Sequence, residues 1–151
     1  MPELIIFILN ILCLIILSAF FSSSETALTA VSEARIHQLA LQGNKRAIII
    51  EKILAKKEKM ISTILIGNNL VNIVASVYAT SFAINFFGNY GLVFITILLT
   101  IILVIFAEVI PKTYAYNHAD QTALSVAPII NFIIFILTPA TFITERFAKT
   151  V

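Results

Sequence analysis

Three long apolar segments dominate the pattern of this chain, at about residues 4–24, 60–84 and 91–110. Each is continuously apolar, and each has the length of about 20 residues with which a helix crosses the hydrocarbon core of a bilayer. Strands of a membrane barrel are shorter and alternate between apolar and polar side chains. The pattern therefore predicts an all-α integral membrane protein with three transmembrane helices.

A fourth apolar stretch, at about residues 123–143, is ambiguous. Its prolines, Pro128 and Pro139, bracket residues 129–138, which as a helix would cover only about 15 Å of a core about 30 Å thick. Basic residues stand on both sides of the stretch, at positions 112, 146 and 149. We expect a re-entrant or belt-like segment at the membrane interface, and a fourth crossing stays the alternative.

Residues 33–59 separate the first two segments and predict two short helices. Apolar residues recur at helical spacing on either side of Gly43 and Asn44, first as Ile36, Leu39 and Ala40 and then as Ala47, Ile50, Ile53 and Leu54. With basic residues between them, these patterns predict cytoplasmic juxtamembrane amphipathic helices that lie on the inner leaflet. The alternative is a pair of solvated linker helices whose lysines only set the topology.

The basic residues predict the orientation of the chain. Seven of the ten lie between the first two apolar segments, and the link NFFGNYG between the second and third carries none. Because cytoplasmic loops are enriched in Lys and Arg, residues 30–59 are predicted to be cytoplasmic and the N-terminus to lie outside. The N-terminal run lacks the basic start of a cleavable signal peptide, so we interpret it as a retained first span of a multi-pass protein of the plasma (inner) membrane.

The composition supports a membrane protein and gives no sign of an enzyme. Hydrophobic residues make up 60% of the chain and charged residues 12%, with a mean hydropathy of +1.01. The two histidines, His37 and His118, are far apart, and Cys13 is the single cysteine. The sequence has no metalloprotease or phosphate-loop motif, and no aromatic residues interleave the basic ones as in nucleic-acid-binding surfaces. We therefore predict neither an enzyme nor a nucleic-acid-binding protein.

Polar side chains interrupt all three predicted spans. Asn68 and Asn72 are four residues apart and share a face of the second span, as Ser18 and Ser22 do in the first. Glu108 follows the uncharged run of the third. Because neighbouring spans run in opposite directions, Ser22, Asn68 and Glu108 all fall in the cytoplasmic third of the bilayer. An ionisable group at that depth usually faces a bundle interior or a water-filled path.

Hydroxyl, amide and carboxylate oxygens without thiol or imidazole suit a hard cation such as Mg²⁺, Ca²⁺ or Na⁺. Pro111 is expected to end or kink the third helix, which would leave carbonyl groups near residue 107 available to a cation. The alternatives are structural. Glu108 can pair with Lys112 at the level of the lipid headgroups, and the serines and asparagines can act as glue between helices.

Three motifs in this chain resemble one family. They are, in chain order, SAFFSSSETALTAVS, IGNNLVNI and FAEVIPKTYA. Together they resemble the transmembrane domain of the CorC/cyclin M (CNNM) magnesium transporters, over essentially the whole chain. The resemblance implies three transmembrane helices, a belt-like segment after the third, a homodimer, and cytoplasmic CBS domains that lie outside this chain in the full-length protein. It also implies efflux of Mg²⁺, alone or in exchange for Na⁺, from a cavity open to the cytoplasm.

By this resemblance the metal ligands are Ser22, Asn68, Asn72 and Glu108, with Ser18 as a further candidate one turn away from Ser22. Two other functions stay open. One is a Mg²⁺ sensor or channel-like module that uses the same residues without coupled exchange. The other is a dimerising membrane anchor for cytoplasmic regulatory domains, in which the intramembrane polar residues only hold helices together.

Overall fold

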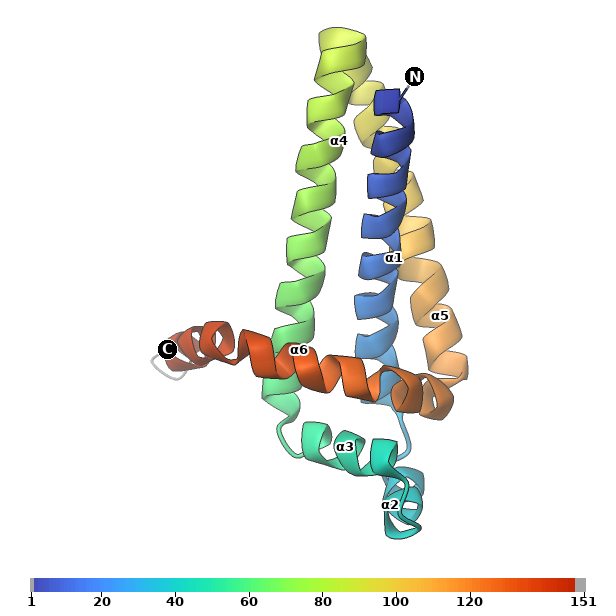
Figure 1. Cartoon of the computed structure of the whole chain (residues 1–151), viewed down its shortest axis with the longest axis vertical. Coiled ribbons are helices and arrows are strands. Elements are labelled where there is room, and N and C mark those ends of the chain that lie inside the picture. The colour runs from blue at the N-terminus through green and yellow to red at the C-terminus, as the bar shows by residue number, and fades with distance from the viewer. Residues whose placement is uncertain (1, 149–151) are drawn as a thin grey trace. The chain divides into compact units, whose positions relative to one another are not determined.

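The computed structural model describes residues 2–148, apart from the side chains of residues 89, 90 and 140–148. Nearly all of these residues are helical, and the described part of the chain contains no strand (Figure 1). The prediction of an all-α protein is therefore confirmed. Lys149, one of the basic residues that flank the fourth apolar stretch, lies outside the described residues.

The helices follow one another with short connections. In chain order they are α1 (Pro2–Ala30), α2 (Glu33–Leu41), α3 (Lys45–Leu54), α4 (Lys57–Ile102), the π-helix η1 (Leu103–Val109), α5 (Ile110–Asn117) and α6 (Ala119–Ala148). The chain divides into two compact units. Unit 1 comprises Met1–Ser23 and Gly67–Tyr114, and unit 2 comprises Ser24–Ile66 and Ala115–Val151.

Four helical stretches among the described residues are long and apolar enough to cross a membrane. They are Pro2–Ala30, Lys57–Gly88, Gly91–Asn117 and Ala119–Pro139. The first three contain the predicted spans, and the fourth contains most of the ambiguous stretch at 123–143. Length and composition thus allow four crossings, and the predicted number of three is not confirmed.

In unit 1, α1 packs against the first part of α4 in an antiparallel register. Near the start of α1, Phe7 stacks on Phe82 with ring centroids 3.7 Å apart. One turn further along α1, the side-chain amide of Asn10 donates to the hydroxyl of Tyr78 at 2.9 Å. Residues later in α1 therefore meet residues earlier in α4, and this register determines which polar side chains of the two helices can touch.

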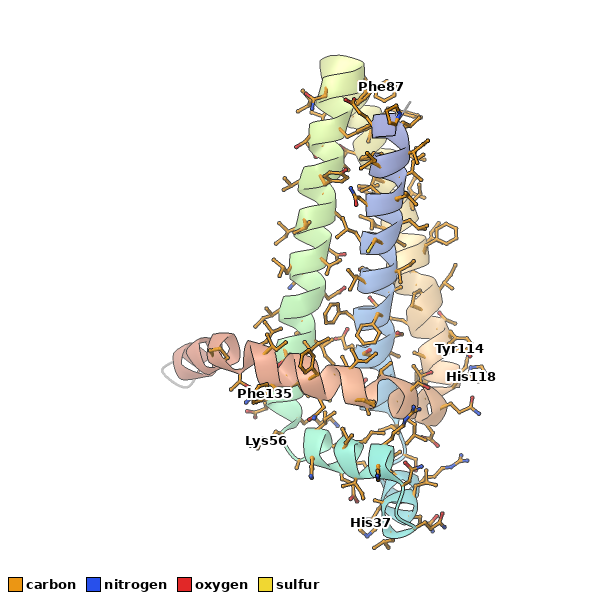
Figure 2. The ribbon with its side chains drawn as sticks, in the orientation of Figure 1. His37, Lys56, Phe87, Tyr114, His118 and Phe135 are labelled. Carbon is orange, nitrogen blue, oxygen red and sulfur yellow. The ribbon has the colours of Figure 1, made fainter. Side chains whose placement is uncertain are left out.

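A sharp turn divides α4 at Gly88, within the link predicted between the second and third spans. The backbone there has φ 63° and ψ −164°, a conformation that is essentially restricted to glycine. Phe87 lies beside the turn (Figure 2). A Cβ atom on Gly91 would collide with the Phe87 side chain, so two glycines make this tight reversal possible.

Pro111 was expected either to end or to kink the third helix. The third long helical stretch does not end there. Instead, the helix widens into η1 one turn earlier and continues as α5, in which Pro111 is the second residue. At the junction the amide of Ile110 donates to the carbonyl oxygen of Ile105, five residues back. The wider turn shifts the hydrogen-bond register before the proline, which has no amide hydrogen to donate.

In unit 2, the predicted 33–59 region contains the two short helices α2 and α3. Side-chain oxygens of Ser32 and Asn44 cap their first turns, and Gly43, at φ 87°, makes the turn between them. Ile36 and Ile50 are completely buried. The apolar faces are therefore used inside the unit, where α2 packs on α3 and α3 on α6, instead of lying only on the inner leaflet.

Asp120 at the start of α6 holds α2 in place. Its carboxylate pairs with the guanidinium of Arg35 at 3.2 Å and accepts the backbone amide of Ser32 at 3.1 Å. His37 and Glu51 join α2 to α3 through a 2.6 Å contact between Nδ1 and Oε1. These polar contacts join α2 to the start of α6 and to α3.

We expect Gly88→Ala to lower the free energy of unfolding by about 1–3 kcal/mol, because a Cβ atom is strained in this backbone conformation. Reversible unfolding in mixed micelles, followed by circular dichroism, measures the change. Asn85→Ala is the control, since Asn85 is exposed in regular helix nearby. Equal stability of the two variants would contradict a glycine-dependent turn.

Candidate functional site

A serine on α1 meets two asparagines on α4 inside unit 1. The hydroxyl of Ser18 donates to the Oδ1 atoms of Asn68 at 3.1 Å and of Asn72 at 2.8 Å. Ser18 is only 2% exposed, and the two asparagines are half-buried. Since Asn68 and Asn72 are four residues apart on one helix face, both reach the same hydroxyl. The structure thus brings together three of the five predicted site residues.

This arrangement leaves oxygen lone pairs available. A serine hydroxyl carries a single hydrogen, so it can serve only one of the two amide oxygens at a time. Two carbonyl-type oxygens that point at one spot repel each other unless a donor or a cation lies between them. The cluster of Ser18, Asn68 and Asn72 therefore has spare acceptor capacity that a cation or a further donor could use.

The close approach of α1 and α4 at this level depends on Gly67, which is buried and precedes Asn68. A Cβ atom at position 67 would lie 2.5 Å from Cε1 of Phe21. Small residues at helix interfaces let backbones approach closely in membranes. The glycine of the IGNN motif thus allows the asparagines to reach α1.

Ser22 lies one turn after Ser18 and on the same face of α1. It is 1% exposed. Like Ser18, it is a buried serine on this face of α1, and its role as a metal ligand stays a prediction.

A smaller polar region lies further along α4, still within unit 1. A cavity of about 50 Å³ there has Ser76 and Thr80 on one side and Thr96 and Thr100 on the other. The hydroxyls of Thr96 and Thr100 each donate to a backbone carbonyl one turn earlier in the helix. Together with the asparagines, this gives α4 a stripe of polar side chains at positions 68, 72, 76 and 80.

Glu108 lies in η1 and pairs with Lys112, whose Nζ donates to Oε1 at 3.0 Å. The Glu108 side chain is 51% exposed. Among the described residues, no hydrogen bond or ion pair joins Glu108 to the cluster of Ser18, Asn68 and Asn72. The pairing considered as an alternative in the sequence is thus present. An exposed ion pair of this kind contributes only about 0–1 kcal/mol, so it holds the carboxylate weakly.

The pair formed by Asn10 and Tyr78, nearer the N-terminal end of α1, was not among the predicted polar contacts. The available signal was a single amide within an otherwise apolar run, and its partner could not be assigned before the register of α1 against α4 was known.

Comparison with known proteins shows to which family the chain belongs. The family model described as "Cyclin M transmembrane N-terminal domain" matches residues 8–151. The chain belongs to the CNNM family. The resemblance seen in its three motifs is thereby confirmed.

Several curated relatives are similar to this CNNM chain. A UPF0053 protein of Haemophilus influenzae is 39% identical over 99% of this chain and 35% of its own length. The UPF0053 inner membrane protein YfjD of Escherichia coli is 36% identical over 71% of this chain and 25% of its own length. The polyamine export protein of Haemophilus influenzae is 28% identical over 97% of this chain and 37% of its own length.

The chain therefore spans about a third or less of the length of these relatives. Its long apolar helices make this CNNM chain a multi-pass membrane protein. The likeness to the Escherichia coli protein supports an inner-membrane location.

We expect Gly67→Ala to separate α1 from α4 and to lower the free energy of unfolding by about 1–3 kcal/mol, the usual cost of overpacking. The matched control is Val77→Ile, which also adds one carbon but at an exposed position of the same helix. Unfolding in mixed micelles measures both. Two variants of equal stability would show that Phe21 moves aside freely and that Gly67 does not set the helix spacing.

Proposed function

We propose that this CNNM chain is the membrane domain of a Mg²⁺ transporter. In this proposal Ser18, Ser22, Asn68 and Asn72 hold the ion with oxygen atoms, and Glu108 supplies the negative charge. The observation that carries the proposal is the convergence of the Asn68 and Asn72 amide oxygens on the hydroxyl of Ser18.

The ligand chemistry favours a hard cation that is released easily. Mg²⁺ is bound by oxygen ligands and usually keeps several of its waters. Hydroxyl and amide oxygens neutralise none of its charge, and one carboxylate neutralises only half. Such a site would bind the ion weakly enough to let it exchange, as transport requires.

Lys112 would then act as the resting partner of Glu108. Its ammonium group donates to the carboxylate at 3.0 Å in the structure. For Glu108 to join the asparagines as a ligand, this ion pair must break and the π-helical segment η1 must turn the carboxylate inward. π-Helical turns inside α-helices are frequent at functional sites.

Three features that the resemblance implies belong to this proposal. The protein would be a homodimer with cytoplasmic CBS domains in the full-length chain, and it would export Mg²⁺, alone or in exchange for Na⁺. The N-terminus would lie outside.

We also propose three crossings, with α6 as the cytoplasmic belt. Within unit 2, α6 runs across the first turns of α4 rather than alongside them, which supports a position at the interface (Figure 1).

A polyamine is the second candidate substrate, because one relative is named a polyamine export protein. The Glu108–Lys112 pair shows how a primary ammonium group would meet this carboxylate. The amide oxygens of Asn68 and Asn72 can accept hydrogen bonds from a second ammonium group.

Calorimetric titration of the purified chain with Mg²⁺ tests the proposal. We expect a saturable isotherm for the native chain and a loss of affinity of about tenfold or more in Asn72→Ala and in Glu108→Gln, since each removes an oxygen ligand or the charge. Asn69→Ala is the matched control, because this neighbouring asparagine is exposed.

Equal Mg²⁺ isotherms in all four proteins would overturn the metal site. If Asn72→Ala then also weakened dimerisation, the membrane-anchor function would take its place. Spermidine titrated in the same way separates the two substrates, because a polyamine transporter would bind spermidine more tightly than Mg²⁺. In liposomes, Mg²⁺ flux that is independent of a Na⁺ gradient would indicate a channel-like module.

Lys112→Gln tests the proposal with a change that should strengthen Mg²⁺ binding. Removing the ammonium frees the Glu108 carboxylate and takes a positive charge away from the ion, so Mg²⁺ affinity should rise by up to about fivefold. The same titration measures it. Unchanged or weaker binding would mean that Lys112 and Glu108 are not coupled to the ion.

A further inference from the structure

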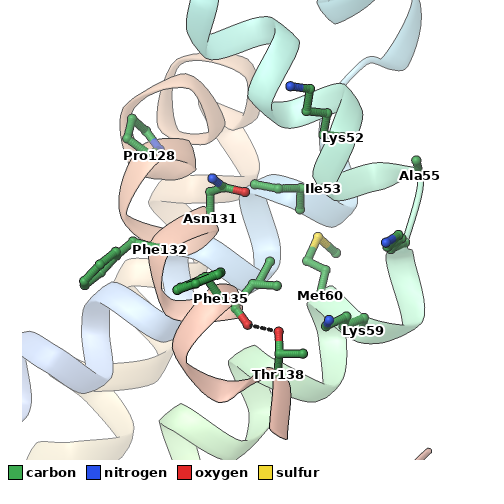
Figure 3. Close-up of a pocket in the computed structure, with 12 residues that line it drawn as sticks. Lys52, Ile53, Ala55, Lys59, Met60, Pro128, Asn131, Phe132, Phe135 and Thr138 are labelled. Carbon is green, nitrogen blue, oxygen red and sulfur yellow. Dashed lines mark hydrogen bonds between the residues drawn. The ribbon is translucent and has the colours of Figure 1, made fainter. Parts of the chain in front are cut away.

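Unit 2 contains a cavity of about 680 Å³, well within the size range of ligand sites. It lies between α6 on one side and α3 with the start of α4 on the other (Figure 3). None of the residues assigned to the proposed Mg²⁺ site lines it. The kind of ligand that the cavity can bind is therefore set by other residues.

One side of the cavity is basic. Lys52 of α3, Lys56 of the turn after it and Lys59 of α4 all line it. That turn is ordered by the amide of Met60, which donates to the carbonyl of Lys56 at 3.0 Å. The lining contains no acidic residue. Within the described part of the chain, none of the three ammonium groups forms an ion pair, so their charges add.

The opposite side of the cavity is apolar and poorly covered. Phe132 and Phe135 of α6 are 63% and 78% exposed, although both are large aromatic residues. Phe135 projects from α6, and Lys56 lies at the turn between α3 and α4 (Figure 2). Met60, which is buried, forms part of the floor. A ligand that fits has an anionic group for the lysines and a hydrocarbon part for the aromatic rings.

We propose that this cavity binds an anionic phospholipid. The phosphate lies among Lys52, Lys56 and Lys59, and an acyl chain lies along Phe132 and Phe135. The exposed amide of Asn131 can donate to an ester or phosphate oxygen.

The occupant follows from the charge and from the environment of the protein. A multi-pass membrane protein meets phospholipid at saturating concentration, and basic pockets on the cytoplasmic side of helices bind anionic headgroups. Free phosphate would satisfy the lysines but would leave both phenylalanines uncovered. An acyl chain covers them while the long lysine side chains reach the headgroup.

Native mass spectrometry of the whole chain tests the proposal. The detergent-purified protein is incubated with equal amounts of phosphatidylglycerol and phosphatidylcholine, and the retained lipids are compared. We expect preferential retention of phosphatidylglycerol. The preference should fall about fivefold for each lysine removed, and it should vanish in Lys52→Gln/Lys56→Gln/Lys59→Gln. Phe135→Ser should weaken retention of both lipids.

The matched control is Lys45→Gln/Arg46→Gln/Lys57→Gln, which removes the same charge from the same region outside the cavity. This variant should keep the preference, as should the Lys→Arg version of the cavity triple. Equal loss in both glutamine triples would overturn the proposal in favour of diffuse surface attraction. Displacement of the lipid by millimolar glycerol phosphate would overturn it in favour of a soluble phosphate ligand, and the absence of any preference in the native chain would overturn it outright.

Discussion

Polar side chains inside apolar helices must find partners, because hydrocarbon offers none. In this chain that constraint is met where α1 and α4 touch, and the proposed site depends on the contact. Gly67 removes the side chain that would keep the helices apart, and Ser18 supplies one hydrogen to two amide oxygens. The proposed cation site would use the spare acceptor capacity of these amide oxygens.

The charge needed to hold a divalent ion lies on a different element with a different kind of backbone. Glu108 belongs to a π-helical segment and is held by Lys112 through a weak, half-exposed pair. Neutral oxygens in a fixed place and a carboxylate that can be exchanged together suit a transported ion better than a structural one. A permanently buried carboxylate beside the asparagines would be costly without its ion. In the proposed mechanism, pairing with Lys112 would avoid that cost between ions.

The helices, and the polar residues that share a helix face, were predictable from the sequence. Long apolar runs predict helices, and i,i+4 spacings place residues on one face. Chain direction and depth predicted Ser22, Asn68 and Glu108 at one level, whereas the structure joins Asn68 and Asn72 to Ser18, one turn away from Ser22. The rest depended on tertiary packing. Local spacing could not show that Ile36 and Ile50 would be buried within unit 2 instead of lying only on the lipid surface. It also could not show that the helix would widen before Pro111 instead of ending there. Nor does hydropathy distinguish a crossing α6 from one that lies at the interface, since both need a long apolar helix.

The most direct test of the account locates the ion itself. Mn²⁺ is bound by the same kinds of oxygen ligand as Mg²⁺ and scatters anomalously, so crystals of the chain grown with Mn²⁺ would reveal its position. We predict an anomalous peak bounded by the oxygens of Ser18, Asn68 and Asn72, with Glu108 turned away from Lys112. A peak only at the carboxylate, with the serine–asparagine hydrogen bonds unchanged, would contradict it. Absence of a peak at Mn²⁺ concentrations that saturate the calorimetric isotherm would contradict it as well.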